Sequence, residues 1–303
     1  MLNSIKKTKL LTFFSLLLCL IISFWVMAFF CTTKTAFAMP FYNLKPEKMV
    51  LRAEFFTSYS TSSQERKENI SLASKALDNT FVDVGCEFSF NQTVGPRTEK
   101  RGYKVSKIIV GGEFVDGVGG GVCQVSSTLY NAVLLAGLKV IEFHPHSLPV
   151  SYVAPSFDAM VNSGSADLKF INDTLNPILI RTYADQSTLK VEIYGQKMQE
   201  KFVRKSVITE EIPAPDMLIE YDETGQFPEL LDGQSKVVKY GKIGYKSQGY
   251  ILVMRNGKLV NMIKIRTDSY APTRGKIIVG KANKTPLENS DNGVDLTMQS
   301  HTD

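Results

Sequence analysis

The sequence predicts an α+β fold in which a cysteine-bearing helix packs on an antiparallel sheet and a small all-β module follows. Directly after Cys123, apolar residues recur every three or four positions, which predicts a helix with one buried stripe. Short strand-like runs divided by Pro, Asn, Asp and Gly then fill residues 140–194, and this order is typical of an α+β domain. Farther along, Asn256-Gly257 stands between two strand-like runs and predicts a β-hairpin.

The first element with a clear pattern is a helix over residues 64–76, where apolar side chains crowd one side. Residues 86–90 and 105–115 change to strand-like runs separated by glycine turns. The helix after Cys123 ends at Gly137, because glycine is favoured just after the last helical turn. The strand-like runs that follow it are 140–143, 150–153, 158–161, 168–171, 178–183 and 189–194.

Composition divides the chain into five parts. Residues 1–38 are expected to be a transmembrane anchor or signal segment, and residues 39–196 to form the α+β domain. Residues 197–232 are charged, contain Pro-Ala-Pro and are predicted to be a linker. Residues 233–282 alternate again and predict the small all-β extracellular module, whereas the polar residues 283–303 predict a disordered tail.

The N-terminal part predicts a location at the cell membrane. Residues 10–30 are an uncharged apolar run of 21 residues, and about 20 suffice to cross a bilayer. Lysines just before this run predict a cytoplasmic N-terminus, with the bulk of the chain outside the cytoplasm. The pattern favours an uncleaved single-pass anchor. Cleavage after Ala38, which ends an Ala-x-Ala sequence, is the alternative and would give a secreted protein.

Charge and cysteine usage exclude other classes of partner. The formal net charge is +5, but four lysines in the first 38 residues account for most of it, so no nucleic-acid partner is expected. The sequence contains no Cys-x-x-Cys motif and no Cys/His cluster at metal-ligand spacing, so no metal is predicted. No other cofactor is expected.

The glycine-dense stretch before Cys123 predicts a reactive thiol. Six of the eleven residues from Gly111 to Gly121 are glycine, yet the lysine and hydroxyl of a phosphate-binding loop are missing. A cysteine in the first turn of a helix has its thiolate stabilised by free N–H groups and by the helix dipole. N–H groups near Gly120, Gly121 and Gln124 could hold an oxyanion in the same place. The alternatives are an inert buried cysteine and a disulfide between Cys86 and Cys123.

Two histidines follow the helix and supply candidates for a base. His146 precedes a strand-like run and is the predicted partner of Cys123, whereas His144 is the alternative. Asp158 opens the next run and is the predicted carboxylate that orients the histidine. A purely structural histidine pair is the remaining interpretation. Cysteine at a helix start, histidine at a strand start and a polar residue on a neighbouring strand are an order used by papain-like and cell-wall cysteine hydrolases.

At these residues the chain resembles the VanW family. The resemblance covers residues 65–195, and the sequence blocks that carry it are 88–98 (FSFNQTVGPRT), 102–104 (GYK), 117–138 (GVGGGVCQVSSTLYNAVLLAGL), 142–153 (EFHPHSLPVSYV) and 158–161 (DAMV). Some members of this family resemble L,D-transpeptidases, which cross-link peptidoglycan through a cysteine. By motif position, the resemblance assigns the nucleophile to Cys123 and its partner to His146.

The resemblance therefore implies a peptidoglycan L,D-transpeptidase that acts on tetrapeptide stems and needs no cofactor. Arg97 and Ser147 are candidates for substrate contact. The alternatives are an L,D-carboxypeptidase or a papain-like endopeptidase with the same site, and a non-catalytic wall-binding protein. Residues 233–282 resemble the extracellular module named for five glycines, which implies contact with wall glycan. The glycines concerned are Gly233, Gly241, Gly244, Gly257 and Gly280.

Overall fold

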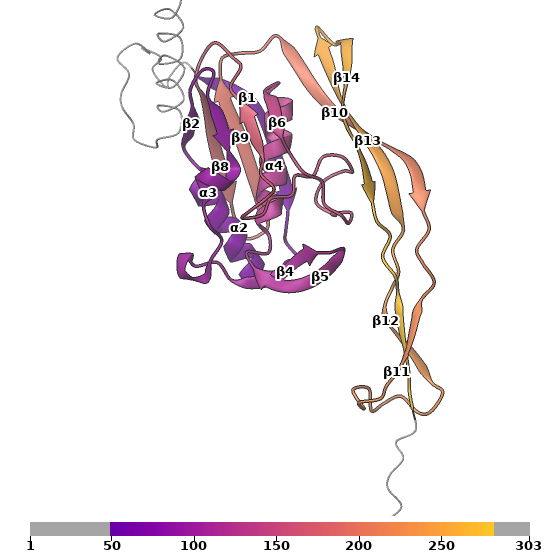
Figure 1. Cartoon of the computed structure of the whole chain (residues 1–303). Helices are drawn as coiled ribbons and strands as arrows, with labels where there is room; N and C mark the ends of the chain where they lie inside the picture. Colours follow the sequence, from indigo (N-terminus) through magenta and orange to yellow (C-terminus); the bar gives the residue numbers. More distant parts are fainter. Residues whose placement is uncertain (1–48, 282–303) are drawn as a thin grey trace, which may run out of the picture. The chain divides into compact units, whose positions relative to one another are not determined.

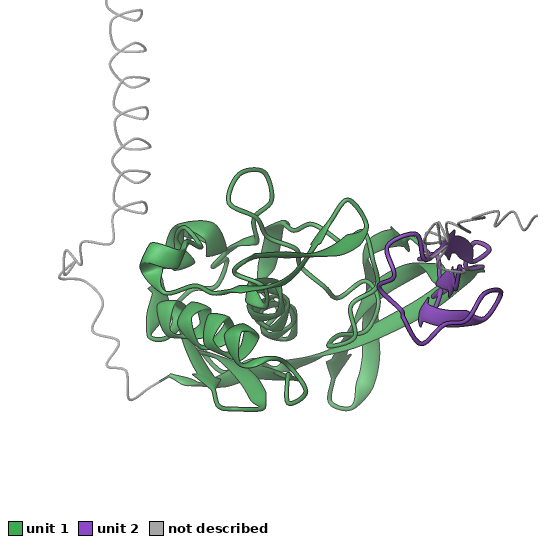
Figure 2. Ribbon diagram, turned by 90° about the horizontal axis from the view of Figure 1, so that it is seen from below, with its two compact units in different colours: residues 1–212, 244–271 green, residues 213–243, 272–303 purple. Residues whose placement is uncertain are grey.

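The computed structural model describes residues 49–281, which cluster into two compact units (Figures 1 and 2). The first unit contains described residues 49–212 and 244–271, and the second contains 213–243 and 272–281. Strands predominate over helices in both, and most strand pairs are antiparallel. The fold is therefore mostly β with a few helices.

The first unit contains a four-stranded antiparallel sheet with two helices packed on it. The strand order is β1 (Val50–Ser58), β9 (Thr188–Gly195), β8 (Ile178–Ala184) and β2 (Thr80–Val82). Helix α4 (Val122–Leu135) packs on β1 and β9, and α2 (Gln64–Leu77) packs on β8. Ser63 caps α2 by accepting a hydrogen bond from the N–H of Arg66.

Helix α4 is buried on nearly every side, not only along its predicted apolar stripe. Its polar residues are accommodated because each finds a hydrogen-bond partner; Thr128, for example, contacts Thr57 Oγ1 at 2.9 Å. The smaller elements around it are β3 (Glu87–Ser89), α3 (Phe90–Val94), η2 (Glu99–Arg101), β4 (Val105–Val110), β5 (Glu113–Val118), β6 (Lys139–Glu142) and β7 (Lys169–Ile171).

A second antiparallel sheet of the first unit has the order β10 (Glu200–Ile212), β13 (Gly244–Arg255) and β14 (Lys258–Tyr270). The hairpin predicted at Asn256-Gly257 is confirmed: the two residues have φ values of 50° and 75° and join β13 to β14. Strand β10 lies in the range predicted as a linker. Exposed and half-buried residues alternate from Glu200 to Ser206, because an antiparallel strand can present one face to solvent.

The second unit contains a three-stranded sheet in the order β11 (Leu218–Tyr221), β15 (Lys276–Val279) and β12 (Ser235–Lys239). Strand β15 pairs in parallel with β11 and antiparallel with β12. The range 233–282, which the sequence presents as one module, is thus divided between the two units.

Two expectations from the sequence are not met. Residues 150–153 and 158–161 form no strand. Around the second range, side chains of α4 take the place of a strand ladder: Asn131 Nδ2 donates to the carbonyl of Phe157, and the N–H of Ala159 donates to Ser127 Oγ. The predicted location as a single-pass membrane protein is corrected: within residues 49–281, no helix is both long and apolar enough to span a bilayer. Residues 10–30 and Ala38, on which that prediction and its secreted alternative rested, lie outside the described residues, as does the tail 283–303.

Candidate functional site

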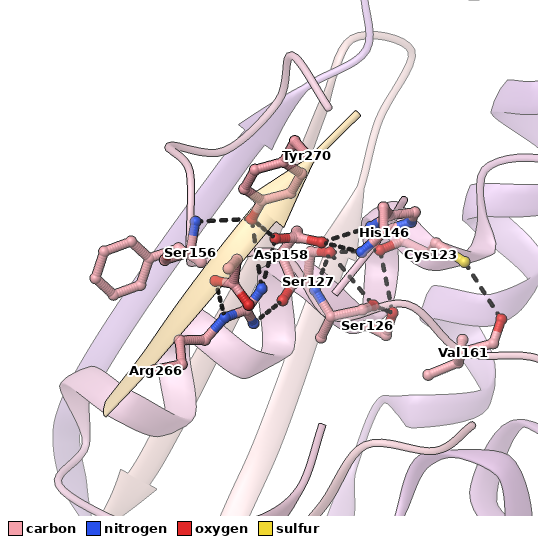
Figure 3. Close-up of polar contacts among 12 residues, drawn as sticks. Cys123, Ser126, Ser127, His146, Ser156, Asp158, Val161, Arg266 and Tyr270 are labelled. Atoms are coloured by element: carbon pink, nitrogen blue, oxygen red, sulfur yellow. Dashed lines mark hydrogen bonds and ion pairs between the residues drawn. The ribbon is translucent and has the colours of Figure 1, made fainter. Parts of the chain in front are cut away.

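The predicted nucleophile, Cys123, is the second residue of α4. Gly121, just before the helix, has a φ of 109°, a left-handed conformation that favours glycine. Cys123 is a free, partly exposed thiol, and its Sγ lies 3.3 Å from the carbonyl oxygen of Val161 (Figure 3). A disulfide between Cys86 and Cys123 is thereby excluded.

The glycines directly before Cys123, from Gly119 to Gly121, are tightly packed. At Gly120 a Cβ would lie 2.6 Å from the backbone oxygen of Lys107 in β4, so a larger residue would push this hairpin away. The carbonyl of Gly120 accepts a hydrogen bond of 2.9 Å from Asn69 Nδ2. The contacts of Gly120 and Gly121 therefore serve turn geometry and close packing, which set the position of Cys123.

His146 and Asp158 are directly hydrogen-bonded and deeply buried. His146 Nδ1 lies 2.7 Å from Asp158 Oδ2, and the backbone N–H of His146 donates to the same oxygen at 2.7 Å. The His146 side chain is 5% exposed and that of Asp158 1% exposed. The alternative base, His144, is about one-third exposed, and its Nε2 pairs with Glu142 Oε1 at 3.1 Å.

Electrostatics link these three residues. Burial disfavours the Cys123 thiolate, but the hydrogen bond and charge of His146 outweigh burial and lower the pKa of the thiol. Burial likewise disfavours the imidazolium, yet Asp158 and Cys123 raise the pKa of His146 to about 9. Burial opposes ionisation of Asp158 as well, but His146 and Arg266 hold its pKa at about 2. At neutral pH the site therefore contains an imidazolium and a carboxylate, and the lowered pKa of the Cys123 thiol favours its thiolate form.

The second oxygen of Asp158 is bound by residues of β14 that sequence reasoning missed. Arg266 Nη2 donates to Asp158 Oδ1 at 2.8 Å, and the Tyr270 hydroxyl donates to the same oxygen at 2.5 Å. Arg266 also donates through Nε to Asp268 Oδ2 at 2.6 Å. Arg266, Asp268 and Tyr270 alternate along the strand and so share one face, which is the signal that could have identified them.

Two serines of α4 fasten the Asp158 segment to the helix. Ser126 Oγ donates to the carbonyl of Ala159 at 2.5 Å. Ser127 Oγ accepts from the N–H of Ala159 at 2.9 Å and donates to the carbonyl of Cys123 at 2.7 Å. These hydroxyls are thus occupied within the fold. They connect the residue next to Asp158 with the turn that bears the thiol.

The other predicted contact residues, Gln124 and Ser147, differ in burial and in their hydrogen bonds within the fold. The N–H of Gln124 donates to the carbonyl of Gly121 at 2.9 Å, and its buried side chain bonds Thr57 and Ser58. Ser147 is exposed, and its carbonyl accepts from the N–H of Ala271 at 2.9 Å.

Arg97 is the predicted contact residue with an unused donor. Its Nη1 donates to Asn91 Oδ1 at 2.8 Å, whereas Nη2 is buried without a hydrogen-bond partner. The positive charge of Arg97 contributes to the lowered pKa of the Cys123 thiol. As for metals, nowhere between residues 49 and 281 do three His, Cys, Asp or Glu side chains lie close enough to share an ion.

Comparisons with known proteins find related sequences over the part of the chain that holds this site. The family model "VanW like protein" matches residues 65–194. The chain is 44% identical over 152 residues to the uncharacterized protein YoaR of Bacillus subtilis (strain 168), with 50% of each chain covered. It is 29% identical over 147 residues to the vancomycin B-type resistance protein VanW of Enterococcus faecalis (strain ATCC 700802 / V583), covering 46% of this chain and 54% of that protein. The chain spans about half the length of these curated relatives.

Two solved structures are also similar to parts of the chain. One is the crystal structure of HP0197-G5, with a TM-score of 0.15, 22% identity and coverage of 27% of this chain and 100% of that one. The other is the IgA1 protease G5 domain, with a TM-score of 0.17, 20% identity and coverage of 28% and 96%.

Proposed function

This chain carries a VanW-family domain at residues 65–194, and we propose that the domain is a peptidoglycan L,D-transpeptidase acting through an acyl-enzyme on Cys123. The observation that carries the proposal is the buried His146–Asp158 pair, which is electrostatically coupled to a free thiol at the start of a helix. A thiolate beside an imidazolium is the arrangement that cysteine-dependent acyl transfer requires.

In the acylation step, Cys123 Sγ attacks the carbonyl carbon that joins the diamino acid of a tetrapeptide stem to its terminal D-Ala. A thioester bond forms and the C–N bond breaks, while the His146 imidazolium gives its proton to the departing amine of D-Ala. The hydrogen on Nδ1 of His146 stays bonded to Asp158, so Nε2 is the nitrogen that gives and takes the proton.

In the second step, the side-chain amine of another stem's diamino acid attacks the thioester. Neutral His146 takes a proton from this amine, the C–S bond breaks, and Cys123 leaves as the thiolate. The product is a cross-link between two diamino acids. Water in place of the amine would release a tripeptide stem, which is the L,D-carboxypeptidase reaction.

The negative charge on the attacked oxygen needs a donor near the thiol. Among the first N–H groups of α4, those of Val122 and Gln124 donate to the carbonyls of Gly119 and Gly121. The N–H of Cys123 itself is the donor that we assign to the oxyanion. Arg97, through the buried Nη2 that has no partner, is the residue that we assign to a stem carboxylate.

Passive binding to the wall does not account for this site. Burial of charged groups is unfavourable unless they compensate one another, and strongly shifted pKa values gather where a reaction uses them. A binding surface would need neither a lowered thiol pKa nor a raised histidine pKa.

The test is incubation of the purified chain with a disaccharide-tetrapeptide, followed by mass measurement of the products. We expect loss of D-Ala together with a cross-linked dimer, both absent in Cys123→Ala. His146→Ala should be strongly impaired, whereas the matched variant His144→Ala, which changes the neighbouring histidine, should remain active. Dimer formation by Cys123→Ala would overturn the proposal. Free D-Ala without a dimer would indicate an L,D-carboxypeptidase in place of the transpeptidase. Stems cut at another bond would indicate an endopeptidase.

A further inference from the structure

We propose that Arg266, Asp268 and Tyr270, which lie outside the matched family domain, are positioning residues that fix the Asp158 carboxylate and thereby the orientation of His146. The inference rests on the proposed function in taking His146 as the acid and base of the reaction. It implies that the working site extends from the domain at residues 65–194 into strand β14.

Both oxygens of the Asp158 carboxylate are held by hydrogen bonds. Asp158 Oδ2 contacts both the ring nitrogen and the backbone N–H of His146, each at 2.7 Å. Oδ1 contacts Arg266 Nη2 at 2.8 Å and the Tyr270 hydroxyl at 2.5 Å. Figure 3 shows Asp158 between His146 on one side and the two β14 residues on the other. With two donors on each oxygen, the carboxylate cannot rotate without breaking hydrogen bonds.

Arg266 is itself fixed on several sides. Besides Oδ1, its guanidinium donates through Nη1 to the backbone carbonyl of Asp158 at 2.6 Å, and through Nε to Asp268 at 2.6 Å. Its Cζ lies 5.9 Å from the ring centre of Tyr130 and 5.1 Å from that of Phe143. The Arg266 and Asp268 side chains are only 3% and 4% exposed. The planar fork of arginine can satisfy this set of acceptors at once, whereas a lysine ammonium cannot.

Tyr270 joins the same cluster to the backbone before Asp158. Its hydroxyl accepts from the N–H of Ser156 at 2.8 Å while donating to Asp158. Beside it, Ser156 Oγ and Ser247 Oγ lie 2.8 Å apart. A Cβ at Gly249 of β13 would lie 2.9 Å from the carbonyl oxygen of Ser156. The sheet therefore approaches this segment closely enough for β14 side chains to reach the carboxylate.

The cluster is poorly explained as a device for stability alone. A buried ion pair often contributes no more to stability than apolar residues of similar volume, because its desolvation is unfavourable. Here the buried donors end on the carboxylate oxygen opposite His146. Such an arrangement limits the movement of the group that orients the ring, which is the requirement for precise proton transfer.

The test follows His146 directly and needs no substrate. The chain has three histidines, so ¹⁵N-histidine labelling of the full chain gives three ring systems in an NMR pH titration. The variants are Tyr270→Phe, which removes one oxygen, and Arg266→Lys, which keeps the charge but loses the fork. The matched controls are Tyr250→Phe and Arg255→Lys on β13. The Tyr250 hydroxyl bonds Gln248 and the Arg255 guanidinium pairs with Glu200, so neither side chain bonds Asp158.

The direction in which the titration midpoint of His146 moves distinguishes a positioning role from a purely electrostatic one. If the carboxylate loses its alignment with Nδ1–H, the titration midpoint of His146 should fall by about one unit, because a hydrogen bond to the charged form favours that form. If only electrostatics changes in Tyr270→Phe, Asp158 loses a donor, becomes more basic, and the midpoint should rise. We expect a fall in both variants and unchanged midpoints in both controls.

A midpoint that is unchanged or higher in Tyr270→Phe would overturn the inference, even if the melting temperature dropped, since that result indicates a purely structural role. Tyr270→Phe decides alone if Arg266→Lys fails to fold. Failure of the proposed function is distinguishable: the midpoint would fall as expected, but the unsubstituted chain would form no cross-linked dimer. If cross-linking occurs, both variants should lower kcat by about 10-fold or more with little change in KM, as expected for a group that acts on the transition state.

Discussion

Replacement of Cys123 by serine should change how the stability of the chain depends on pH. The reason lies in the pKa shifts of Cys123 and His146. In the folded chain the His146 pKa is raised to about 9, so the imidazole keeps its proton at pH 7.5, whereas the lowered pKa of the thiol favours loss of the Cys123 proton. In the unfolded chain the ordinary values are 9.0 for the thiol and 6.5 for the imidazole, so at pH 7.5 the thiol keeps its proton and the imidazole loses it. The two shifts offset each other, so the pair gives less pH dependence of stability between about pH 6.5 and 9 than either group would give alone.

The two contributions have opposite signs. The raised pKa of His146 adds stability that is complete below pH 6.5 and is lost as pH rises toward 9. The lowered pKa of Cys123 adds stability that is complete above pH 9.0 and is lost as pH falls toward the folded pKa. Serine removes the second contribution and leaves the first, because Asp158 still holds the imidazolium. The unfolding free energy of Cys123→Ser should therefore fall with pH above 6.5.

The size of this fall follows from the His146 shift. The rise of the His146 pKa from 6.5 to about 9 corresponds to about 3 to 4 kcal/mol at about 1.4 kcal/mol for each pH unit, and this is an upper limit because serine also removes the contribution of Cys123 to that rise. The assay is urea denaturation of both proteins at half-unit steps from pH 5.5 to 9. The difference between the two curves isolates the pair, since all other groups are shared. Parallel curves above pH 6.5 would refute the coupling of thiol and imidazole.

Further predictions concern activity and packing. His146→Ala should reduce cross-linking by on the order of 10² to 10⁴-fold, compared with less than about 3-fold for His144→Ala, in rates of dimer formation. Asp158→Asn should reduce the same rate by on the order of 10³-fold or more with the fold intact by circular dichroism, because an amide cannot hold the Nδ1–H tautomer as a carboxylate does. The rate should also decline above pH 9, where His146 loses its proton; a flat profile to pH 10 would argue against His146 as the acid. Gly120→Ala should lower unfolding free energy by about 1 to 3 kcal/mol in urea melts because its Cβ would overlap backbone, whereas Gly164→Ala, with open space around it, should not.

The local part of the site could be predicted from sequence. The stripe after Cys123 indicates where α4 lies, and the two histidines that follow are the natural candidates for a partner. The choice between them was not fixed by pattern alone. The structure separates them because His146 is buried against Asp158, whereas His144 is partly exposed beside Glu142.

The distant part of the site could not be predicted in the same way. Arg266 and Tyr270 are 108 and 112 residues from Asp158 in sequence, so their meeting depends on how β14 packs against a loop. Alternation along β14 shows that the two share a face, but not which surface that face contacts. The sequence predicts a linker where β10 lies for a related reason: its charges resemble those of a solvated connection until pairing with β13 is known.

The serine bonds beneath the site have a mechanical consequence. Because Ser126 and Ser127 tie Ala159 to the first turn of α4, a fluctuation that displaces the helix carries the neighbouring Asp158 with it. Thiol and carboxylate then belong to one rigid piece, and thermal breathing of the molecule changes their separation little. The imidazole between them bonds the same carboxylate through its Nδ1 and its backbone N–H, so it follows Asp158 when the helix moves. The reacting groups should therefore keep their relative positions from one step of the reaction to the next.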